Sequence, residues 1–479
     1  MKKILFVASE AAPFVKTGGL GEVVGALPKY INSKKYDVRV ILPKYQSMDK
    51  KWDKKLKKIT DFTINVSWRQ QYVGLMKTKV GNIQYYFIDS EYYFGGSAPY
   101  DNIYMDFEKF TYFCKAVVES LQWMDFIPDI IHCHDWQSSL IPMFLYDMLL
   151  SENHAIKSIQ TIHNMRFQGR LEMGLAKDII GLDAWYFLPD KLEFYGEVNC
   201  LKGGIIFADK ITTVSHNYAK EIQTPEGGEG LNGLMRVKAD SLIGIENGID
   251  YMEYNPSADD YIPTNYDVDT VKAGKRENKK RLQKEMGLAV NSKAFLIGVV
   301  SRLTKQKGFD LLKLAMKDLC TLPNIQFVIL GSGEEGYESM LRYYTQQYPD
   351  KIAASIGYSD ELSHKIYAAA DAYLMPSMFE PCGLSQLISM RYGTLPIVRE
   401  TGGLKDTVKP YNQYEQTGDG FGFQNYNWME MYQIILYAKE VFEVHKKQWN
   451  AMVQRAMQED HSWESSAKKY EELYEEVLG

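Results

Sequence analysis

Short runs of apolar, β-favouring residues alternate along the chain with longer stretches of helical pattern. In the first half we predict strands at Ile4–Ala8, Val38–Leu42, Ile83–Ile88, Asp129–Cys133, Ser158–Ile162, Lys210–Val214 and Leu242–Ile245. In the second half we predict strands at Phe295–Val300, Gln326–Leu330, Ile352–Ile356, Ala372–Met375 and Leu395–Val398. Helical stretches lie between them, such as Phe107–Trp123 and Leu140–Leu150, and the end from about Trp428 is almost all helical in pattern. This alternation predicts parallel sheets joined by crossover helices.

The domain organisation follows from where this rhythm breaks. Asp61–Trp68 and Tyr72–Val80 have no helix between them, so we expect a hairpin-like insertion there. Asn255–Asn278 is polar and contains two prolines, which is typical of a linker or of the entry loop of a second unit. Because the rhythm restarts only once, we predict an α/β protein of two doubly wound domains, residues 1–250 and 251–459.

Composition and charge exclude several classes of protein. Of the 479 residues 45% are hydrophobic and 24% charged, as in ordinary globular proteins. The formal net charge of −6 provides no basic footprint, so we expect no nucleic-acid partner. The sequence contains no long uncharged apolar window, so we expect no membrane partner. Five scattered cysteines indicate a reducing compartment, here the cytoplasm. Aromatic residues reach 13% with 34 tyrosines, which invites a sugar-binding interpretation.

The segment Gly331–Gly336 matches the G-x-G-x-x-G pattern of dinucleotide-binding turns. That fingerprint needs an acid that closes the second strand, about twenty residues on. Asp350 is near that distance, but it precedes the next predicted strand instead of ending it. We therefore favour a tight strand-to-helix turn and keep an NAD-dependent oxidoreductase as the alternative.

A second glycine motif follows the first predicted strand. Lys16 precedes Thr17-Gly18-Gly19-Leu20, and Thr401-Gly402-Gly403-Leu404 repeats the last four letters. Glycines let the backbone approach a phosphate closely, and a helix start offers N–H donors. The lysine beside the first motif favours an anion site over an ordinary turn, although the order of a Walker motif is absent.

Two cations follow the strand Phe295–Val300 in the segment Ser301–Gly308. Arg302 offers a planar fork of donors and Lys307 a compact charge, which together suit a diphosphate. The alternative is a solvated basic loop. We favour function because the loop lies at the carboxyl end of a parallel strand, where ligands bind.

Histidines gather at the ends of two other strands. His132-Cys133-His134-Asp135 ends one, and Thr161-Ile162-His163-Asn164 ends the next. His132 and His134 share one face of a strand and could hold a metal, but no partner motif with zinc-ligand spacing exists. We favour polar groups beside a cleft that contact hydroxyls, and we expect no metal.

The segment after the strand Ala372–Met375 contains a carboxylate followed by a helix start. Glu380 precedes Pro381 and is therefore extended, and Gly383-Leu384-Ser385 opens a helix with free N–H donors. This pair suits a polyhydroxylated ligand that carries a phosphate. Cys382 could act as a nucleophile with His163, but no local base accompanies it, so a packed thiol is favoured.

Taken together, these motifs resemble a known family. Glu246-Asn247-Gly248-Ile249-Asp250 adds to the motifs above, and the set, in this order, is similar to bacterial glycogen synthases and plant starch synthases over nearly the whole chain. The resemblance implies a GT-B glycosyltransferase with two Rossmann-like domains that face each other across a cleft. In such chains the C-terminal helix, here residues 460–479, returns to the first, acceptor-side domain, and the second domain binds the nucleotide sugar.

The resemblance also implies the reaction. Such enzymes transfer glucose from ADP-glucose to the non-reducing end of an α-1,4-glucan, elongating glycogen with retention of the anomeric configuration. They need no metal and no cofactor, since ADP-glucose is a substrate. The two-carboxylate pattern of related families is not met, because Ile388 stands eight residues after Glu380. We therefore expect front-face attack with the leaving phosphate as base.

The residue roles that the resemblance implies fall into three groups. For catalysis these are Glu380, His163, Arg302 and Lys307; for donor binding Lys16, Gly18, Gly19, Asn247, Tyr358, Leu384 and Ser385; on the sugar or acceptor side Asp135, Cys382 and Gly383. Tyr358 would stack on the nucleobase and Ser385 would contact the distal phosphate. The family commonly has Thr in place of Ser385 and often Asp in place of Glu22. A glucan- or nucleotide-binding module without catalysis is the remaining alternative, and it predicts binding without turnover.

Overall fold

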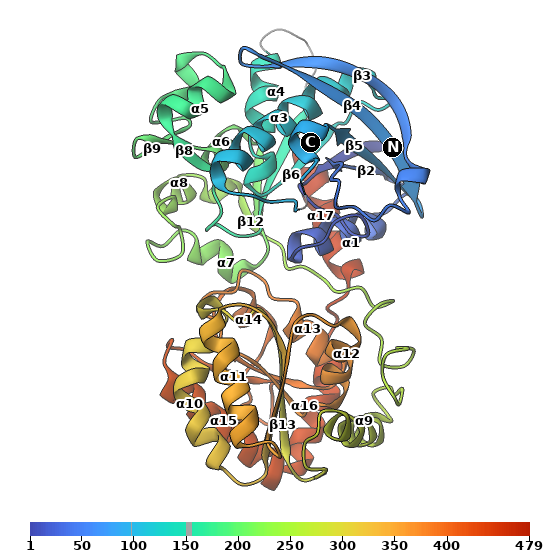
Figure 1. The fold of residues 1–479 in the computed structure, drawn as a ribbon, viewed down its shortest axis with the longest axis vertical. Helices are drawn as coiled ribbons and strands as arrows, with labels where there is room; N and C mark the ends of the chain where they lie inside the picture. The colour runs from blue at the N-terminus through green and yellow to red at the C-terminus, as the bar shows by residue number, and fades with distance from the viewer. Residues whose placement is uncertain (97, 150–155) are drawn as a thin grey trace. The chain divides into compact units, whose positions relative to one another are not determined.

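The computed structural model describes residues 1–96, 98–149 and 156–479. These residues form two compact units, Met1–Asn247 with Trp463–Gly479, and Gly248–Ser462 (Figure 1). The boundaries expected from the sequence, after residues 250 and 459, lie close to these. Among the described residues no helix is both long and apolar enough to cross a membrane.

The first unit contains a nine-stranded sheet of order β12-β11-β7-β6-β1-β2-β5-β4-β3. Its strands are β1 (Lys2–Val7), β2 (Tyr36–Pro43), β3 (Lys57–Val66), β4 (Arg69–Val80), β5 (Ile83–Asp89), β6 (Ile130–His134), β7 (Lys157–Ile162), β11 (Lys210–Thr213) and β12 (Leu242–Gly244). All pairings are parallel except those of β3 with β4 and β4 with β5. The predicted hairpin therefore exists, but it is not a separate insertion, because β4 pairs with β5 and extends the main sheet.

A small antiparallel sheet and a set of helices complete the described part of the first unit. The small sheet contains β8 (Arg170–Glu172), β10 (Glu197–Asn199) and β9 (Glu193–Phe194). The helices are α1 (Gly19–Tyr30), α2 (Glu91–Phe94), α3 (Ile103–Ser120), α4 (Ile141–Leu149), α5 (Met173–Ile180), α6 (Cys200–Phe207), α7 (His216–Glu221), α8 (Asn232–Val237) and α17 (Trp463–Leu478). Leu150, the end of one predicted helical stretch, lies outside the described residues.

The helix α17 belongs to the first unit although it ends the chain. Tyr474 is fully buried there, and its hydroxyl lies 3.0 Å from Nδ1 of His132. Ion pairs join Lys35 to Glu475 and Lys210 to Glu476. The return of the C-terminal helix to this unit thus rests on a buried aromatic contact and on charges at its rim.

The second unit contains a parallel six-stranded sheet of order β15-β14-β13-β16-β17-β18. Its strands are β13 (Phe295–Val300), β14 (Ile325–Gly331), β15 (Ile352–Ile356), β16 (Ala372–Met375), β17 (Leu395–Arg399) and β18 (Phe421–Phe423). Its helices are α9 (Val271–Glu285), α10 (Phe309–Thr321), α11 (Glu335–Gln347), α12 (Asp360–Ala369), α13 (Ser385–Arg391), α14 (Gly402–Thr407), α15 (Trp428–Val444) and α16 (Lys446–Gln458). In Figure 1, α10, α11 and α15 lie on one side of the strands, and α9 and α12 on the other.

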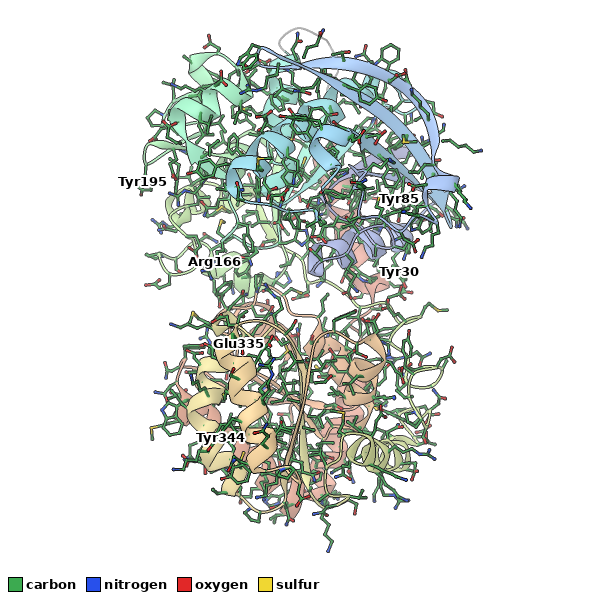
Figure 2. The ribbon with its side chains drawn as sticks, viewed as in Figure 1. Tyr30, Tyr85, Arg166, Tyr195, Glu335 and Tyr344 are labelled. Carbon is green, nitrogen blue, oxygen red and sulfur yellow. The ribbon has the colours of Figure 1, made fainter. Side chains whose placement is uncertain are left out.

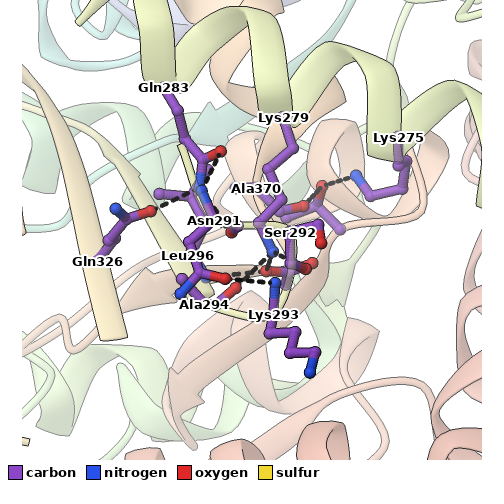
Figure 3. A network of polar contacts seen from close by, with 12 residues as sticks. Lys275, Lys279, Gln283, Asn291, Ser292, Lys293, Ala294, Leu296, Gln326 and Ala370 are labelled. Carbon is purple, nitrogen blue, oxygen red and sulfur yellow. Dashed lines mark hydrogen bonds and ion pairs between the residues drawn. The ribbon is translucent and has the colours of Figure 1, made fainter. Parts of the chain in front are cut away.

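The predicted linker Asn255–Asn278 is wrong in its last third, because α9 begins at Val271. Its hidden face is mixed, with polar side chains beside Val271 and Leu282. The Lys275 ammonium donates to three backbone carbonyls and to Thr394. Lys279 pairs with Asp371 at 2.6 Å, and Gln283 donates to Gln326 at 2.7 Å. Figure 3 shows these side chains reaching from one helix into a shared network. Apolar periodicity cannot detect such a helix.

The tyrosines serve the core and the surface without forming a separate module. Figure 2 labels Tyr85 and Tyr195, an example of a buried and of an exposed tyrosine. Tyr85 is fully buried and packs edge-on against Phe14, whereas Tyr195 is 82% exposed. Tyr343 and Tyr344 are neighbours on α11, with ring centroids 5.2 Å apart. The aromatic surplus therefore belongs mainly to packing.

Candidate active site

In each of the two large sheets the strand order reverses at one point, and the residues that the sequence selected for chemistry follow strands near that point. In the second unit the reversal lies between β13 and β16, and in the first between β1 and β6. Ligands of open parallel sheets bind at the carboxyl ends of the strands that flank such a point.

The pocket of the second unit opens at the ends of β13 and β16 and encloses about 180 Å³. It is lined by Val299, Val300, Ser301, Arg302, Lys307, Leu374, Met375, Ser377 and Ser385. Arg302 stands two residues after β13, and Lys307 ends the 3₁₀ turn η6 (Lys305–Lys307). The structure thus brings together both cations that the sequence selected for a diphosphate.

Glu380 is bound within this group. Its Oε2 accepts from Nζ of Lys307 at 2.6 Å and from the hydroxyl of Ser377 at 3.0 Å. The Glu380 side chain is almost buried, at 7% exposure for the residue. A buried carboxylate persists only when paired and hydrogen-bonded, and both conditions are met here. Sequence reasoning missed Ser377, which stands at the end of β16 just as Arg302 does at the end of β13.

The backbone around Glu380 is fixed by a second segment. Arg399 donates to the carbonyls of Ser377 and Met378, and the amide of Gly403 donates to the carbonyl of Glu380 at 3.1 Å. A Cβ at position 402 would lie 2.0 Å from the Glu380 carbonyl oxygen, where only glycine fits. The second Thr-Gly-Gly-Leu motif therefore supports the loop that positions Glu380.

The helix start after Glu380 is formed as predicted. Gly383 has a φ of +75°, Leu384 caps α13, and Ser385 is its first residue. Ser385 lines the pocket. Cys382 is buried at 5% exposure. Its burial fits the packed thiol that the sequence analysis favoured.

Tyr358 follows Gly357, whose φ of +136° turns the chain after β15. Its ring is 79% exposed, and its hydroxyl donates to Asp360. An exposed ring tethered at its far end suits a flat ligand. Stacking on a nucleobase stays a prediction.

Two glycines of the G-x-G-x-x-G segment are required by close packing of the backbone. A Cβ on Gly331 would lie 1.9 Å from the Ser301 carbonyl oxygen, and one on Gly333 would lie 2.3 Å from that of Leu303. Leu303 and Gly333 form a parallel bridge. These glycines let the Arg302 loop approach β14, which is the tight turn the sequence analysis favoured.

The glycine loop of the first unit is held by a buried acid. The Glu10 carboxylate accepts from the amide of Thr17 at 2.5 Å, from its hydroxyl at 2.8 Å, and from the hydroxyl of Tyr100 at 2.6 Å. Lys16 pairs with Glu22 at 3.2 Å. Sequence reasoning missed Glu10; the available signal was an acid at the carboxyl end of a buried parallel strand.

Gly18 and Gly19 differ from the packing glycines. A Cβ at either position would meet nothing within 4 Å among the described residues. Neither has a positive φ that demands glycine. The open space beside both glycines leaves room for a ligand to approach the backbone.

Asp135 positions the loop after β7. Its Oδ1 accepts from the amide of His163 at 2.7 Å and from that of Asn164 at 3.4 Å. Asp135 itself has a φ of +56°, an uncommon conformation that functional sites often contain. Burial raises the pKa of Asp135 to about 7. Asn247, also selected from the sequence, is 6% exposed, and its Oδ1 has no partner among the described residues.

The histidines form a stacked group. The rings of His132 and His134 stack with centroids 4.4 Å apart. Nδ1 of His134 lies 3.0 Å from Nε2 of His163, while Nε2 of His132 lies 2.6 Å from the hydroxyl of Thr161. Burial lowers the pKa of His132 and His163 to about 3. These nitrogens bond to one another and to hydroxyls, which is the arrangement of a polar network.

Comparisons with known proteins agree with this architecture. The family model described as starch synthase catalytic domain matches residues 3–237, and the one described as glycosyl transferases group 1 matches residues 272–448. A glycogen synthase of Lachnoclostridium phytofermentans is 55% identical over all of both chains. A glycogen synthase of Lachnospira eligens is 55% identical over 99% of both chains. The catalytic domain of starch synthase IV from Arabidopsis thaliana, solved with ADP and acarbose, has a TM-score of 0.90 and 34% identity, covering 100% of this chain and 99% of that one.

The class of protein is a glycosyltransferase of GT-B fold, as the two doubly wound units and the matched domains show. A sucrose-phosphate synthase from Thermosynechococcus elongatus, 16% identical with a TM-score of 0.63 over 100% of this chain and 99% of that one, shares the fold. Within that class the chain belongs to the starch synthase and glycogen synthase family.

Proposed function

We propose that this enzyme transfers glucose from ADP-glucose to the non-reducing end of an α-1,4-glucan and so elongates glycogen. The 55% identity to a glycogen synthase over the full length of both chains supports the reaction. The ADP bound to the starch synthase IV domain supports adenine as the base. Within the chain, the observation that carries the proposal is the Lys307–Glu380 pair beside Arg302 in one pocket.

The second unit supplies the charges that this transfer needs. Arg302 and Lys307 stabilise the negative charge that grows on the diphosphate as it leaves. Such fixed charges act more strongly on the transition state than on the ground state. Glu380 binds a sugar hydroxyl and stabilises the oxocarbenium-like ring. Ser385 and the Leu384 amide bind the distal phosphate, Tyr358 stacks on the base, and Cys382 and Gly383 shape the sugar side.

The first unit supplies groups for a sugar and for a phosphate. Lys16 provides a cation, and Gly18 and Gly19 leave room for phosphate oxygens. His163 positions the glucosyl group, and Asp135 and Asn247 provide oxygens for hydroxyls. The glycine loop is preorganised by Glu10, so little ordering entropy remains to oppose binding.

In this proposal the anomeric configuration is retained without a protein nucleophile. A double displacement needs a second carboxylate, and Ile388, at the matching position, is a buried residue of α13. The acceptor hydroxyl instead attacks on the face that the diphosphate leaves, and the departing phosphate takes its proton. No metal and no cofactor enter the proposal, since the cations of the chain neutralise the phosphates.

A donor comparison tests the function. The protein is incubated with glycogen and either ADP-glucose or UDP-glucose, and nucleoside diphosphate release and chain elongation are followed. We expect transfer from ADP-glucose, product linkages in the α configuration, and at least a hundredfold loss in Glu380→Gln. Glu415→Gln, which changes an exposed acid of the same unit, serves as the matched control. Absence of transfer from both donors, or full turnover by Glu380→Gln, refutes the proposal.

The same proposal places the enzyme in the cytoplasm. Within the described residues none of the five cysteines forms a disulfide, and all five are buried. A reducing compartment suits such thiols.

A further inference from the structure

The contact between His134 and His163 determines where the proton of His163 lies. Nδ1 of His134 and Nε2 of His163 are 3.0 Å apart. Burial lowers the pKa of both imidazoles, that of His163 to about 3, so both rings are neutral at physiological pH. A neutral imidazole has one donor and one acceptor nitrogen. One of the two facing nitrogens therefore donates and the other accepts.

The other nitrogen of His134 decides between the two cases. Nε2 of His134 is buried and has no hydrogen-bond partner within the described part of the chain. The ring stacks with both His132 and Phe6, so it cannot turn freely toward another partner. A proton on Nε2 would leave a buried N–H donor unpaired, which is costlier than an unpaired lone pair. The proton of His134 therefore lies on Nδ1 and is donated to Nε2 of His163.

His163 must then carry its own proton on Nδ1. The described residues give this nitrogen no hydrogen-bond partner, and His163 is only partly covered at the carboxyl end of β7. Asp135 fixes the same residue from the other side by accepting its backbone amide. His134 thus holds the ring in one tautomer and Asp135 fixes the backbone that carries it, while the Nδ1–H has no partner among the described residues.

We propose that His134 is a positioning residue that locks His163 as the Nδ1–H tautomer, so that His163 donates a hydrogen bond to an oxygen of the transferred sugar. His163 then acts as a hydrogen-bond donor, and it neither accepts a proton from the acceptor hydroxyl nor delivers one. The identity of the ligand as a glucosyl group rests on the proposed function, whereas the tautomer does not.

Histidine-selective ¹⁵N labelling and long-range ¹H–¹⁵N spectra of the full chain test the tautomer directly. We expect the His163 signals, assigned by their loss in His163→Asn, to show a protonated Nδ1 and a bare Nε2. A protonated Nε2 in the unmodified protein overturns the proposal, and this result needs neither a variant nor turnover. If transfer from ADP-glucose fails while the spectrum shows Nδ1–H, the proposed function falls and the tautomer stands.

Two isosteric variants test the positioning role. His134→Asn keeps an N–H donor near the place of Nδ1, whereas His134→Asp offers only acceptors when ionised. We expect His134→Asn to keep the Nδ1–H tautomer and turn over within about threefold of the unmodified enzyme. We expect His134→Asp to convert His163 to Nε2–H and lower kcat at least tenfold with little change in donor KM. His134→Leu removes the partner without introducing a charge, so we expect both tautomers of His163. This variant shows whether a lower kcat in His134→Asp comes from the buried charge or from the changed tautomer. Equal kcat in all three variants overturns the role.

Discussion

Replacing Glu10 by glutamine should loosen the glycine loop of the first unit. Three donors converge on this carboxylate: the Thr17 amide, the Thr17 hydroxyl and the Tyr100 hydroxyl. The backbone amide cannot reverse its polarity, so the side-chain oxygen of the introduced glutamine must face it and the NH₂ group must face the hydroxyls. Both hydroxyls can rotate to accept, and Tyr100 can then donate to Ser9, 2.8 Å away. The number of hydrogen bonds can therefore be kept, but their charge assistance is lost.

The size of the effect follows from that count. A hydrogen bond to a charged group contributes about 1 kcal/mol more than a neutral one. The loss of charge assistance in three bonds therefore costs about 3 kcal/mol at most, and relaxation of the neighbours reduces this cost. Since 1.4 kcal/mol is about a factor of ten in an equilibrium constant, we expect ADP to bind about 10- to 100-fold more weakly. We expect Glu10→Ala to exceed this loss, because the Thr17 amide would have no partner.

Two measurements separate the structural effect from the functional one. Amide hydrogen exchange reports whether Thr17 becomes less protected, and calorimetric titration with ADP reports affinity. Glu172→Gln is the matched control, since Glu172 accepts the amides of Gly174 and Leu175 on the rim of the same unit. If exchange and affinity in Glu10→Gln both stay within twofold, Glu10 does not hold the loop. Faster exchange with unchanged affinity would refute the assignment of Lys16, Gly18 and Gly19 to the diphosphate.

Three further perturbations test the rest of the site and its support. Ser377→Ala leaves Lys307 as the remaining side-chain partner of the Glu380 carboxylate seen in the structure, and we expect kcat for diphosphate release to fall about tenfold, the value of about 1.4 kcal/mol; an unchanged kcat would contradict a positioning role for Ser377. For Asp135 the folded-state pKa of about 7 exceeds the ordinary value of 3.8, so the stability from this group is complete below about pH 4 and is lost as pH rises to about 7. The melting temperature of Asp135→Asn should therefore rise relative to that of the unmodified protein between about pH 4 and pH 7 and change little further above pH 7; a pH-independent difference would exclude the coupling. Lys279→Met breaks a buried ion pair and should destabilise the second unit by about 3–5 kcal/mol, and adding Asp371→Asn should restore part of this loss. Hydrogen exchange in β13 measures the stability of the single and the double variant, and equal exchange in the two would argue against the pair.

The strands of the second unit were predictable because burial makes them short, uninterrupted apolar runs. β13, β15 and β16 have the bounds that the sequence predicts. Both faces of a parallel sheet are covered by helices, so no polar alternation interrupts these segments. β18 was missed because its three residues, Phe421–Phe423, are too few to form a pattern.

The helix α9 shows what periodicity cannot detect. Its buried residues include Asn278, Lys279 and Gln283, which apolar counting treats as exposed. Each is satisfied by partners far along the chain: Asn278 bonds with Thr264, Lys279 with Asp371 and Gln283 with Gln326. A buried polar face depends on such long-range partners, and the partners are known only when the fold is known.

The same limit applies to the supports of the candidate site. Arg302, Lys307 and Glu380 were recognisable because each follows a predicted strand and has a charge suited to the ligand. Glu10 and Ser377 follow strands too, but their importance comes from what they hold in place: the Thr17 amide in one case and the Glu380 carboxylate in the other. The chemistry of a site is thus more visible in the sequence than its preorganisation.

The two Thr-Gly-Gly-Leu segments show how a structure separates fold from function where the letters agree. A Cβ on Gly402 or Gly403 would lie 2.0 or 2.2 Å from a carbonyl oxygen of the Glu380–Cys382 segment, so the chain's own packing explains these glycines. A Cβ on Gly18 or Gly19 would meet nothing within 4 Å among the described residues, so packing does not explain them. A glycine that the fold does not require, at the carboxyl end of a strand beside a lysine, is best explained by a ligand that approaches the backbone. We therefore predict that the first segment contacts a ligand, whereas the second supports the loop that carries Glu380.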